Sequence, residues 1–282
     1  MSHYSNQDFH AALSAFETAL KLEKENSSPI KFAQYLFAKA STLGQLEKPE
    51  EMIAVLDELD RHFGTGTTPA LRKIVAAGLR IKGMTLGYLD KPQDEIVVYD
   101  VLDRRFGADT NPYVREQVAK GLVNKGFRLG KLNKLVDEMA VYDELDKRFG
   151  ADTTPAVRAQ VARGLNSAGF HRILLAKQMW QDAATRNEHL SVTAAGLQRA
   201  SAQCGEHEQA MILGNLGYSL FLAGQHKEAE APTLESLQLG GQNMLDAQRA
   251  DAKLHRVEPE DSQYEELLNK LWQSLPSAAP QG

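Results

Sequence analysis

One sequence pattern occurs three times in this chain, at a constant spacing of 43 residues. Phenylalanine-glycine pairs, leucine-glycine pairs, single glycines and single prolines all follow this spacing. The positions are Phe63-Gly64, Phe106-Gly107 and Phe149-Gly150; Leu43-Gly44, Leu86-Gly87 and Leu129-Gly130; Gly78, Gly121 and Gly164; and Pro69, Pro112 and Pro155. Self-similarity with a period of a few tens of residues is typical of repeat arrays, in which each unit is one supersecondary element that stacks on the next.

The residues within one period predict a pair of helices. In the middle unit, Asn111 is a good N-cap, and Pro112 suits the first helical position, where its missing N–H is no loss. Gly130 is predicted to end this helix or to lie just beyond it. A second helix is predicted from about Leu135 to Gly150, with Gly150 in the left-handed conformation. The predicted buried faces are Val114, Val118, Leu122 and Leu129 on the first helix, with Leu71, Val75, Leu79 and Leu86 as their equivalents in the preceding unit, and Met139, Tyr142, Leu145 and Phe149 on the second. The predicted fold is therefore an all-α solenoid of stacked antiparallel helical hairpins.

A glycine recurs in the middle of each predicted first helix, at Gly78, Gly121 and Gly164. A glycine in a helix interior costs about 1 kcal/mol relative to alanine. Its repetition at one position of the period indicates that neighbouring helices approach too closely there for a side chain. We interpret these three glycines as packing residues.

Residues 1–282 are interpreted as a single solenoid that consists of several segments. They are an N-terminal capping helix at 7–25, the 43-residue repeats at 26–168, an irregular helical segment at 169–204, a shorter repeat at 205–240, C-terminal capping helices at 241–275 and a disordered tail at 276–282. The periodicity breaks where Val192-Thr193 stands in place of a further Phe-Gly pair.

Three local signals near the C-terminus make further predictions. Pro232 is expected to kink the helix in which it lies. Gly240-Gly241 is expected to end that helix. Ser262 and Glu265 have the spacing of a capping box and predict the start of the last helix.

The segment NLGYSLFLAGQHKEAEAPTLESLQLG resembles a tetratricopeptide repeat. Gly217, Phe221, Gly224 and Ala229 match the small residue, the aromatic residue, the turn glycine and the alanine of that motif. The 43-residue units resemble the same family with longer repeats, and there Glu95 and Glu138 occupy the place of the small alanine. The resemblance implies a superhelix whose first helices line a groove that holds a protein or peptide.

Helical phase selects the residues that such a groove would present. The expected partner-binding residues are Ile81 and Met84, beside Ile74 and Ala77, in the second unit; Gln117, Lys120, Asn124 and Phe127 in the third; Gln160 and Arg163 in the fourth; and Asn215 and Tyr218 in the last repeat. Lys120 and Asn124 resemble part of the carboxylate clamp of some tetratricopeptide domains, although Gly164 occupies the place of the next asparagine. The alternative is that both are solvated helix positions.

Composition and motifs argue against several other functions. The chain is 43% hydrophobic and 24% charged with a net charge of −5, and no basic footprint for nucleic acid is evident. A single cysteine, Cys204, fits a reducing compartment, and no apolar run approaches the length of a membrane span, so a cytoplasmic location is expected. Cys204 and His207 alone fall short of a zinc site, and no nucleophile motif is present. We therefore expect a scaffold without catalytic residues, cofactor or metal.

Other functional readings stay open. One is an inhibitory partner protein, similar to an immunity protein or an antitoxin. Another is an enzyme or ligand-responsive regulator that uses the irregular segment, with His171, Trp180, His189 and Cys204 as candidate pocket residues. Self-association through exposed faces of the solenoid is a further possibility.

Overall fold

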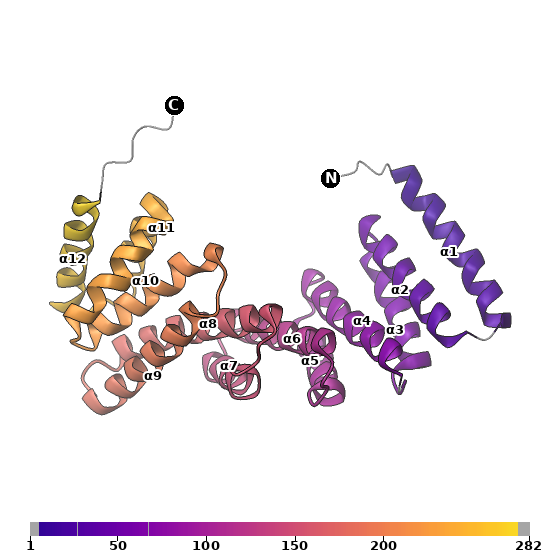
Figure 1. Ribbon diagram of the computed structural model, residues 1–282, viewed down its shortest axis with the longest axis horizontal. Coiled ribbons are helices and arrows are strands. Elements are labelled where there is room, and N and C mark those ends of the chain that lie inside the picture. Colours follow the sequence, from indigo (N-terminus) through magenta and orange to yellow (C-terminus); the bar gives the residue numbers. More distant parts are fainter. Residues whose placement is uncertain (1–5, 27, 67, 276–282) are drawn as a thin grey trace. The chain divides into compact units, whose positions relative to one another are not determined.

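The computed structural model describes residues 6–26, 28–66 and 68–275, and the secondary structure in those ranges consists of helices without strands. The helices are α1 (Asn6–Asn26), α2 (Pro29–Gln45), α3 (Pro49–Phe63), α4 (Pro69–Tyr88), α5 (Pro92–Phe106), α6 (Pro112–Lys131), α7 (Leu135–Phe149), α8 (Pro155–Gln178), α9 (Ala183–Ser201), α10 (Glu206–Leu222), α11 (His226–Lys253) and α12 (Glu260–Ser274) (Figure 1). The all-α repeat fold predicted from the sequence is confirmed. The tail predicted after residue 275 lies outside the described residues.

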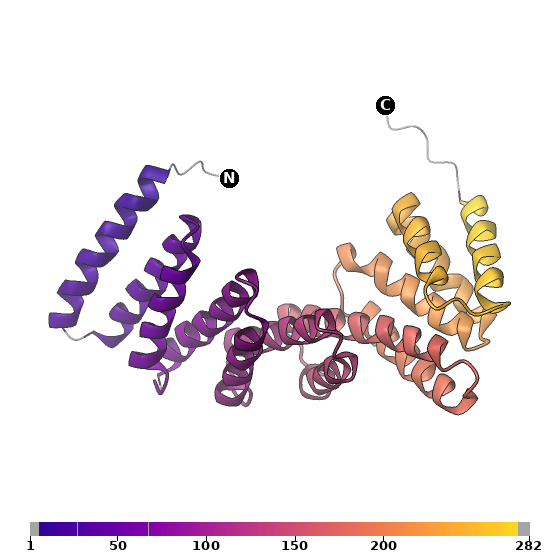
Figure 2. The same cartoon turned by 180° about the vertical axis from the view of Figure 1, so that it is seen from behind.

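The chain divides into two compact units, residues 1–128 and 129–282, with the boundary near the end of α6. In the first unit α2 packs on α3 and α4 on α5, and α1 covers α2. Figure 2 shows α1, α2 and α3 side by side from behind. The core of this part is formed by small and branched apolar side chains of α2, α3 and α4, namely Ala33, Leu36, Ala40, Leu43, Val55, Leu56, Leu59 and Leu71.

In the second unit α7 packs on α8, α8 on α9, α10 on α9 and α11, and α12 on α11. A core cluster there joins helices α8 to α12 and includes Ile173, Leu190, Tyr218, Phe221, Leu237, Leu245, Tyr264 and Leu268. The loss of the sequence period here has a structural cause. Helix α8 has 24 residues, whereas α4 and α6 have 20 each, so the second helix of this hairpin starts later.

The apolar stripes predicted for the repeats are buried as expected. Every residue of the three predicted faces is at most 9% exposed: Leu71, Val75, Leu79 and Leu86; Val114, Val118, Leu122 and Leu129; and Met139, Tyr142, Leu145 and Phe149. The predicted N-cap is also confirmed, because the Asn111 Oδ1 accepts hydrogen bonds from the backbone N–H groups of Tyr113 and Val114.

The recurring mid-helix glycines are confirmed as packing residues. A Cβ atom on Gly78 would lie 2.9 Å from Leu59 Cδ2, and one on Gly121 would lie 2.7 Å from Leu102 Cδ2. In the second unit, a Cβ atom on Gly164 would lie 2.7 Å from Leu145 Cδ2. The three leucines follow the same 43-residue spacing. Each glycine therefore receives the leucine of the second helix that precedes it.

The conformation predicted for Gly150 is wrong. Its φ of −59° and ψ of −28° are right-handed, and Gly64 and Gly107 have nearly the same angles. The reason for glycine is a close approach, because the Gly150 N–H donates to the Asp146 carbonyl at 2.7 Å and a Cβ atom would lie 2.5 Å from that oxygen. The left-handed position follows the first helix of each repeat instead, at Glu47, Asp90 and Asn133, with φ of 55°, 53° and 58°.

One of the C-terminal predictions was wrong. The backbone departs from helical angles within α11 at Gly241, with φ of 58° and ψ of −148°, as expected for a stop there. Pro232 lies in the interior of the same helix, and its φ and ψ are helical. Helix α12 begins at Glu260, so Ser262 lies inside it and the capping box is wrong. Ser262 and Glu265 both accept hydrogen bonds from Arg256 instead.

The glycine-leucine packing predicts that Gly121→Ala destabilises the protein, although alanine has the higher helix propensity. Propensity alone would raise the free energy of unfolding by about 1 kcal/mol, whereas overpacking against Leu102 is expected to lower it by roughly 1–3 kcal/mol. Urea unfolding of both single variants and of Gly121→Ala with Leu102→Ala measures the coupling. Additive effects of the two substitutions would contradict a direct steric contact.

Candidate functional site

The predicted groove face of α4 is partly buried and partly open. Ala77 is 3% exposed, and Ile74 packs against the core of the first unit. Toward the end of the helix, Ile81 and Met84 line a pocket of about 550 Å³, and Met84 is 49% exposed. Two of the predicted partner-binding residues are therefore brought together at one opening.

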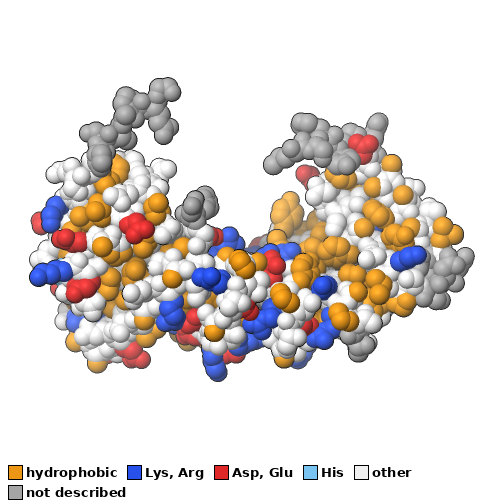
Figure 3. All heavy atoms as spheres, viewed as in Figure 1, with side chains coloured by type: hydrophobic (Ala, Val, Ile, Leu, Met, Phe, Trp, Pro, Cys, Tyr) orange, Lys and Arg blue, Asp and Glu red, His pale blue; other side chains and the backbone are white. Residues whose placement is uncertain are grey.

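This pocket, which we call the α2–α4 pocket, lies between the turn after α2, the start of α3 and the end of α4. Its lining consists of Gly44, Glu47, Lys48, Pro49, Met52, Ile81, Met84, Thr85 and Tyr88. Tyr88 is 81% exposed, which is a large apolar exposure for a tyrosine. Hydrophobic side chains gather over the α2 and α4 region in Figure 3. The helical periodicity of the sequence identified two of these residues, Ile81 and Met84, and the others come from the end of α2, the turn, the start of α3 and the end of α4.

The second repeat shows what fills the corresponding place. Glu95, in the first turn of α5, is 5% exposed and forms an ion pair with Arg128 of α6. The Arg128 Nη2 also donates to the Gly87 carbonyl at 3.1 Å. A Cβ atom on Gly87 would lie 2.6 Å from Glu95 Oε2, so the recurring Leu-Gly glycine makes room for the carboxylate.

The second unit contains a related arrangement around Glu138, which is 1% exposed. Ser167 Oγ donates to Glu138 Oε1 at 3.0 Å, and His171 Nδ1 lies 2.8 Å from Oε2. A Cβ atom on Gly130 would lie 2.5 Å from Glu138 Oε2. The carboxylates that replace the small alanine of the tetratricopeptide motif are therefore buried and paired, and their place in the first helical turn is not explained by the helix dipole alone.

In the first repeat both partners of this pair are replaced. The 43-residue spacing puts Met52 in the place of Glu95 and Thr85 in the place of Arg128. Thr85 Oγ1 donates to the Ile81 carbonyl at 2.9 Å and lies 3.6 Å from Met52 Sδ. Threonine is too short to fill the space that an arginine side chain takes, so the α2–α4 pocket has an uncharged base and remains open.

The partner-binding residues predicted on α6 differ in their exposure and in their contacts. Phe127 is 55% exposed, as expected for a groove. Exposure was wrongly predicted for Gln117, which is 3% exposed and accepts a hydrogen bond from Arg80 Nε at 2.6 Å. Lys120 pairs with Glu116 on its own helix, and Asn124 Nδ2 donates to the Tyr99 hydroxyl at 3.2 Å. The proposed clamp residues thus already have partners within the chain.

The predicted residues of the second unit are mostly buried. Gln160 and Asn215 are 6% and 8% exposed, and Asn215 Nδ2 donates to Asn166 Oδ1 at 2.9 Å. Arg163 is exposed and forms an ion pair with Glu208 at 2.6 Å. The exposure predicted for Gln160 and Asn215 is therefore wrong, because neighbouring helices cover the faces of α8 and α10 on which these residues lie.

Tyr218 is also buried, and it belongs to a polar network that sequence reasoning missed. Its hydroxyl accepts a hydrogen bond from Lys177 Nζ at 2.7 Å and donates to Asp261 Oδ1. Lys177 and Asp261 form an ion pair at 3.0 Å, and both side chains are 0% exposed. The ring of Tyr218 stacks on Tyr264 with 4.5 Å between ring centroids. This network joins α8 and α10 to α12 and its preceding turn, and no local motif predicts it.

Burial governs the ionisation of these groups. Loss of solvent lowers the pKa of Lys177 against the opposing effect of Asp261, and it raises the pKa of Tyr218, with hydrogen bonding to Asp261 as the next cause. The same desolvation raises the pKa of Asp251 to about 6, although the nearby Lys177 acts in the opposite direction.

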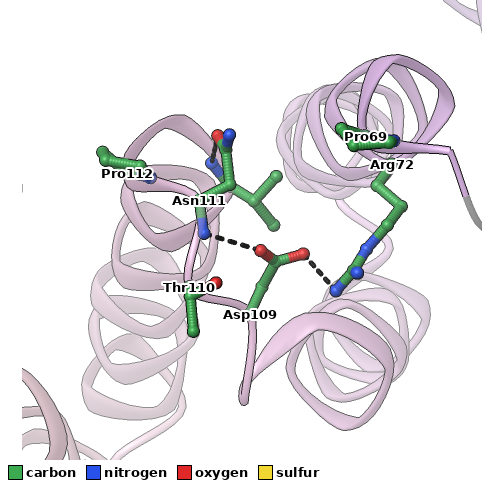
Figure 4. A pocket seen from close by; sticks show the side chains of 7 residues that line it. Pro69, Arg72, Asp109, Thr110, Asn111 and Pro112 are labelled. Carbon is green, nitrogen blue, oxygen red and sulfur yellow. Dashed lines mark hydrogen bonds and ion pairs between the residues drawn. The ribbon is translucent and has the colours of Figure 1, made fainter.

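A second pocket, of about 360 Å³, lies between the first turns of α4 and α6 and the turn that precedes α6 (Figure 4). Asp109 in its wall is 5% exposed, and its Oδ1 accepts a hydrogen bond from the Asn111 N–H at 2.8 Å. The Oδ2 atom forms an ion pair with Arg72. Because its charged groups are already paired, we interpret this pocket as a structural contact between repeats.

The residues considered for catalysis or metal binding have other roles or are separate. Cys204 is half-buried and contacts the Ser201 carbonyl, and burial raises the pKa of its thiol. The His207 side chain lies outside the described residues. His171 contacts Glu138, whereas the Trp180 ring lies under the guanidinium of Arg186. Within the described ranges, no group of three or more His, Cys, Asp or Glu side chains is placed to hold a metal ion, and no helix is long and apolar enough to cross a membrane.

The buried pair in the second repeat predicts a large effect of Arg128→Met. This substitution leaves the Glu95 carboxylate buried without its cation, and it is expected to lower the free energy of unfolding by roughly 2–4 kcal/mol. The double variant Glu95→Met with Arg128→Thr has the residues of the first repeat and should lie within about 1 kcal/mol of the parent protein. Urea unfolding at neutral pH distinguishes the two. Equal losses in both variants would contradict this account.

The raised pKa of Asp251 predicts a pH-dependent gain from Asp251→Asn. The folded state holds the proton more tightly than the unfolded state, so the parent protein loses stability relative to the variant as the pH rises from about 4 through about 6. The carboxyl is partly exposed, and the expected gain above pH 7 is therefore only about 1–2 kcal/mol, falling toward zero near pH 4. Urea unfolding across this range measures it. A gain of equal size at every pH would contradict the prediction.

Comparison with known proteins supports the fold without assigning a family. No sequence model of a known family and no curated protein matches this chain. Among solved structures, BtubC (BKLC) from P. vanneervenii is similar with a TM-score of 0.53 and 14% identity, over 82% of this chain and 90% of that one. MamA residues 41 to the end from Desulfovibrio magneticus RS-1 gives 0.46 and 16%, over 73% and 94%. The MamA RS-1 ArsTM double mutant gives 0.48 and 15%, over 73% and 93%. At this level of identity the likeness to BtubC bears on the all-α architecture alone.

Proposed function

We propose that this chain is a non-catalytic adaptor that binds a segment of a partner protein along the first helices of its repeats. The observation that carries the proposal is the α2–α4 pocket, an opening with exposed Met84 and Tyr88 at its edge. Large apolar side chains grouped at an opening are typical of sites that bind proteins or apolar ligands.

The chemistry of the lining favours binding over reaction. Two thioethers, an aliphatic side chain and an aromatic ring offer apolar contact, and the charged lining residues are Glu47 and Lys48. Lys48 Nζ is paired with Glu51 at 2.7 Å. A surface that needs no reactive residue also suits a repeat protein, since stacked helices provide extended faces for recognition.

The proposal differs from the one that helical phase alone suggested. Lys120 and Asn124 have partners within the chain, so a carboxylate clamp on α6 is not needed to explain them. Met84 and Ile81 line the pocket, and exposed Phe127 provides a further apolar contact in the same unit. The partner is therefore expected to be recognised by apolar side chains more than by its C-terminal carboxylate. A cytoplasmic location remains part of this proposal.

The test is site-specific photo-crosslinking in the source cell. A benzophenone amino acid at Tyr88 is expected to give a discrete adduct with another protein, whereas the same probe at Val97, which is 58% exposed on α5, is expected to give none. Met84→Ser in the Tyr88 probe protein removes an apolar wall and should weaken the adduct by about tenfold. Adducts of equal strength at both probe positions, or none at Tyr88, would rule out this binding face.

A further inference from the structure

We propose that the α2–α4 pocket anchors one large apolar side chain of the partner segment, next to a basic residue that pairs with Glu47. This inference rests on the proposed function and adds the chemistry of the recognised segment. It follows from comparing the same place in successive repeats, from the lining of the pocket and from the charges at its rim.

The repeats themselves show which chemistry the base of the pocket has lost. In the second repeat, the buried Glu95 carboxylate and the Arg128 guanidinium satisfy each other. In the first repeat Met52 and Thr85 replace both, so that neither a cation nor an anion finds its counter-charge at the base. Burying an unpaired charge there would be costly. The base of the pocket therefore selects an uncharged, apolar occupant.

The walls fit such an occupant in size and adaptability. The volume of about 550 Å³ lies within the usual range of ligand pockets and accommodates a large side chain with part of its backbone. Met52 and Met84 supply flexible, polarisable walls that adjust to leucine, methionine or phenylalanine. Arg80 Nη1 lies 2.8 Å from Met84 Sδ and helps to hold that side chain at the end of α4.

The rim provides charge complementarity for a neighbouring cation. Glu47 lies in the turn after α2, where its backbone has φ of 55° and its N–H donates to the Gly44 carbonyl at 3.3 Å. Its side chain is exposed and has no ion pair in the described part of the chain. The other charged lining residue, Lys48, is neutralised by Glu51. Among the lining residues the uncompensated charge is thus that of Glu47, whereas the Arg80 cation lies beside Met84 on α4 and outside the lining. The Glu47 carboxylate favours a lysine or arginine beside the apolar anchor.

The test uses phage-displayed random peptides of about twelve residues. In an extended conformation such a peptide is long enough to contact more than one repeat. The library is selected on the full chain and counter-selected on Met52→Glu with Thr85→Arg. This double variant installs the ion pair of the second repeat and is expected to fill the pocket while the fold is kept. Circular dichroism and thermal unfolding check folding, and Met84→Ser serves as a second variant at an exposed position.

The expected outcome is a set of peptides that share one large apolar residue beside a lysine or arginine. Replacing the anchor by alanine, or using the double variant, should weaken binding by about tenfold or more in fluorescence anisotropy. Glu47→Lys should weaken it by roughly two- to fivefold, less so at high salt.

Three results would overturn the inference: no enriched peptide, a consensus without an apolar anchor, or binding that the double variant and Met84→Ser leave unchanged. Failure of the inference remains distinguishable from failure of the proposed function. If peptides bind independently of the pocket but still compete with the crosslink at Tyr88, the binding face stands and the anchor is wrong. If the Tyr88 probe gives no adduct in the cell, the proposed function itself fails.

Discussion

The packing of a leucine against a mid-helix glycine is the constraint on which the repeat architecture depends. Leu59 occupies the place of a side chain at Gly78, and Leu102 does so at Gly121. A side chain at either glycine would push the two helices apart, and the displacement would be passed to the stripes that bury the core. The same contact between Leu145 and Gly164 continues into the second unit, where the periodic sequence ends soon afterwards. Both the leucine and the glycine of this contact recur every 43 residues, so each repeat of the period forms the contact once.

A second recurring contact differs between the repeats in its chemistry. The start of each second helix faces the glycine of the Leu-Gly pair, and the facing residue is Met52, Glu95 or Glu138. Glu95 has an arginine partner, and Glu138 has serine and histidine partners. The position therefore accepts either an apolar or a charged side chain, provided that a buried charged group has a partner. The backbone contact is kept while the surface above it changes from a closed ion pair to an open pocket.

The sequence predicts the helices of the repeats well because period, proline, N-cap and apolar stripe all indicate the same boundaries. It misassigns Gly150, because glycine is selected both by left-handed angles and by close approach to a carbonyl, and the sequence does not separate these causes. It also misplaces Asn215 and Tyr218. Helical phase shows that they share a face of α10, but not that Asn166, Lys177 and Asp261 cover that face. Such contacts between residues far apart in the chain depend on tertiary packing.

The α2–α4 pocket can exist because the leucine–glycine contact and the contact at Met52, Glu95 or Glu138 are independent of each other. In the first unit Leu59 packs against Gly78, as the equivalent leucines do in the other repeats. The neighbouring buried pair contributes little net stability, since a satisfied ion pair and well-chosen apolar residues are often nearly equivalent in a protein interior. Replacing it by Met52 and Thr85 therefore leaves the array intact and releases the space at the end of α4. A site for recognition can arise at this position because the fold tolerates either a satisfied ion pair or uncharged side chains there.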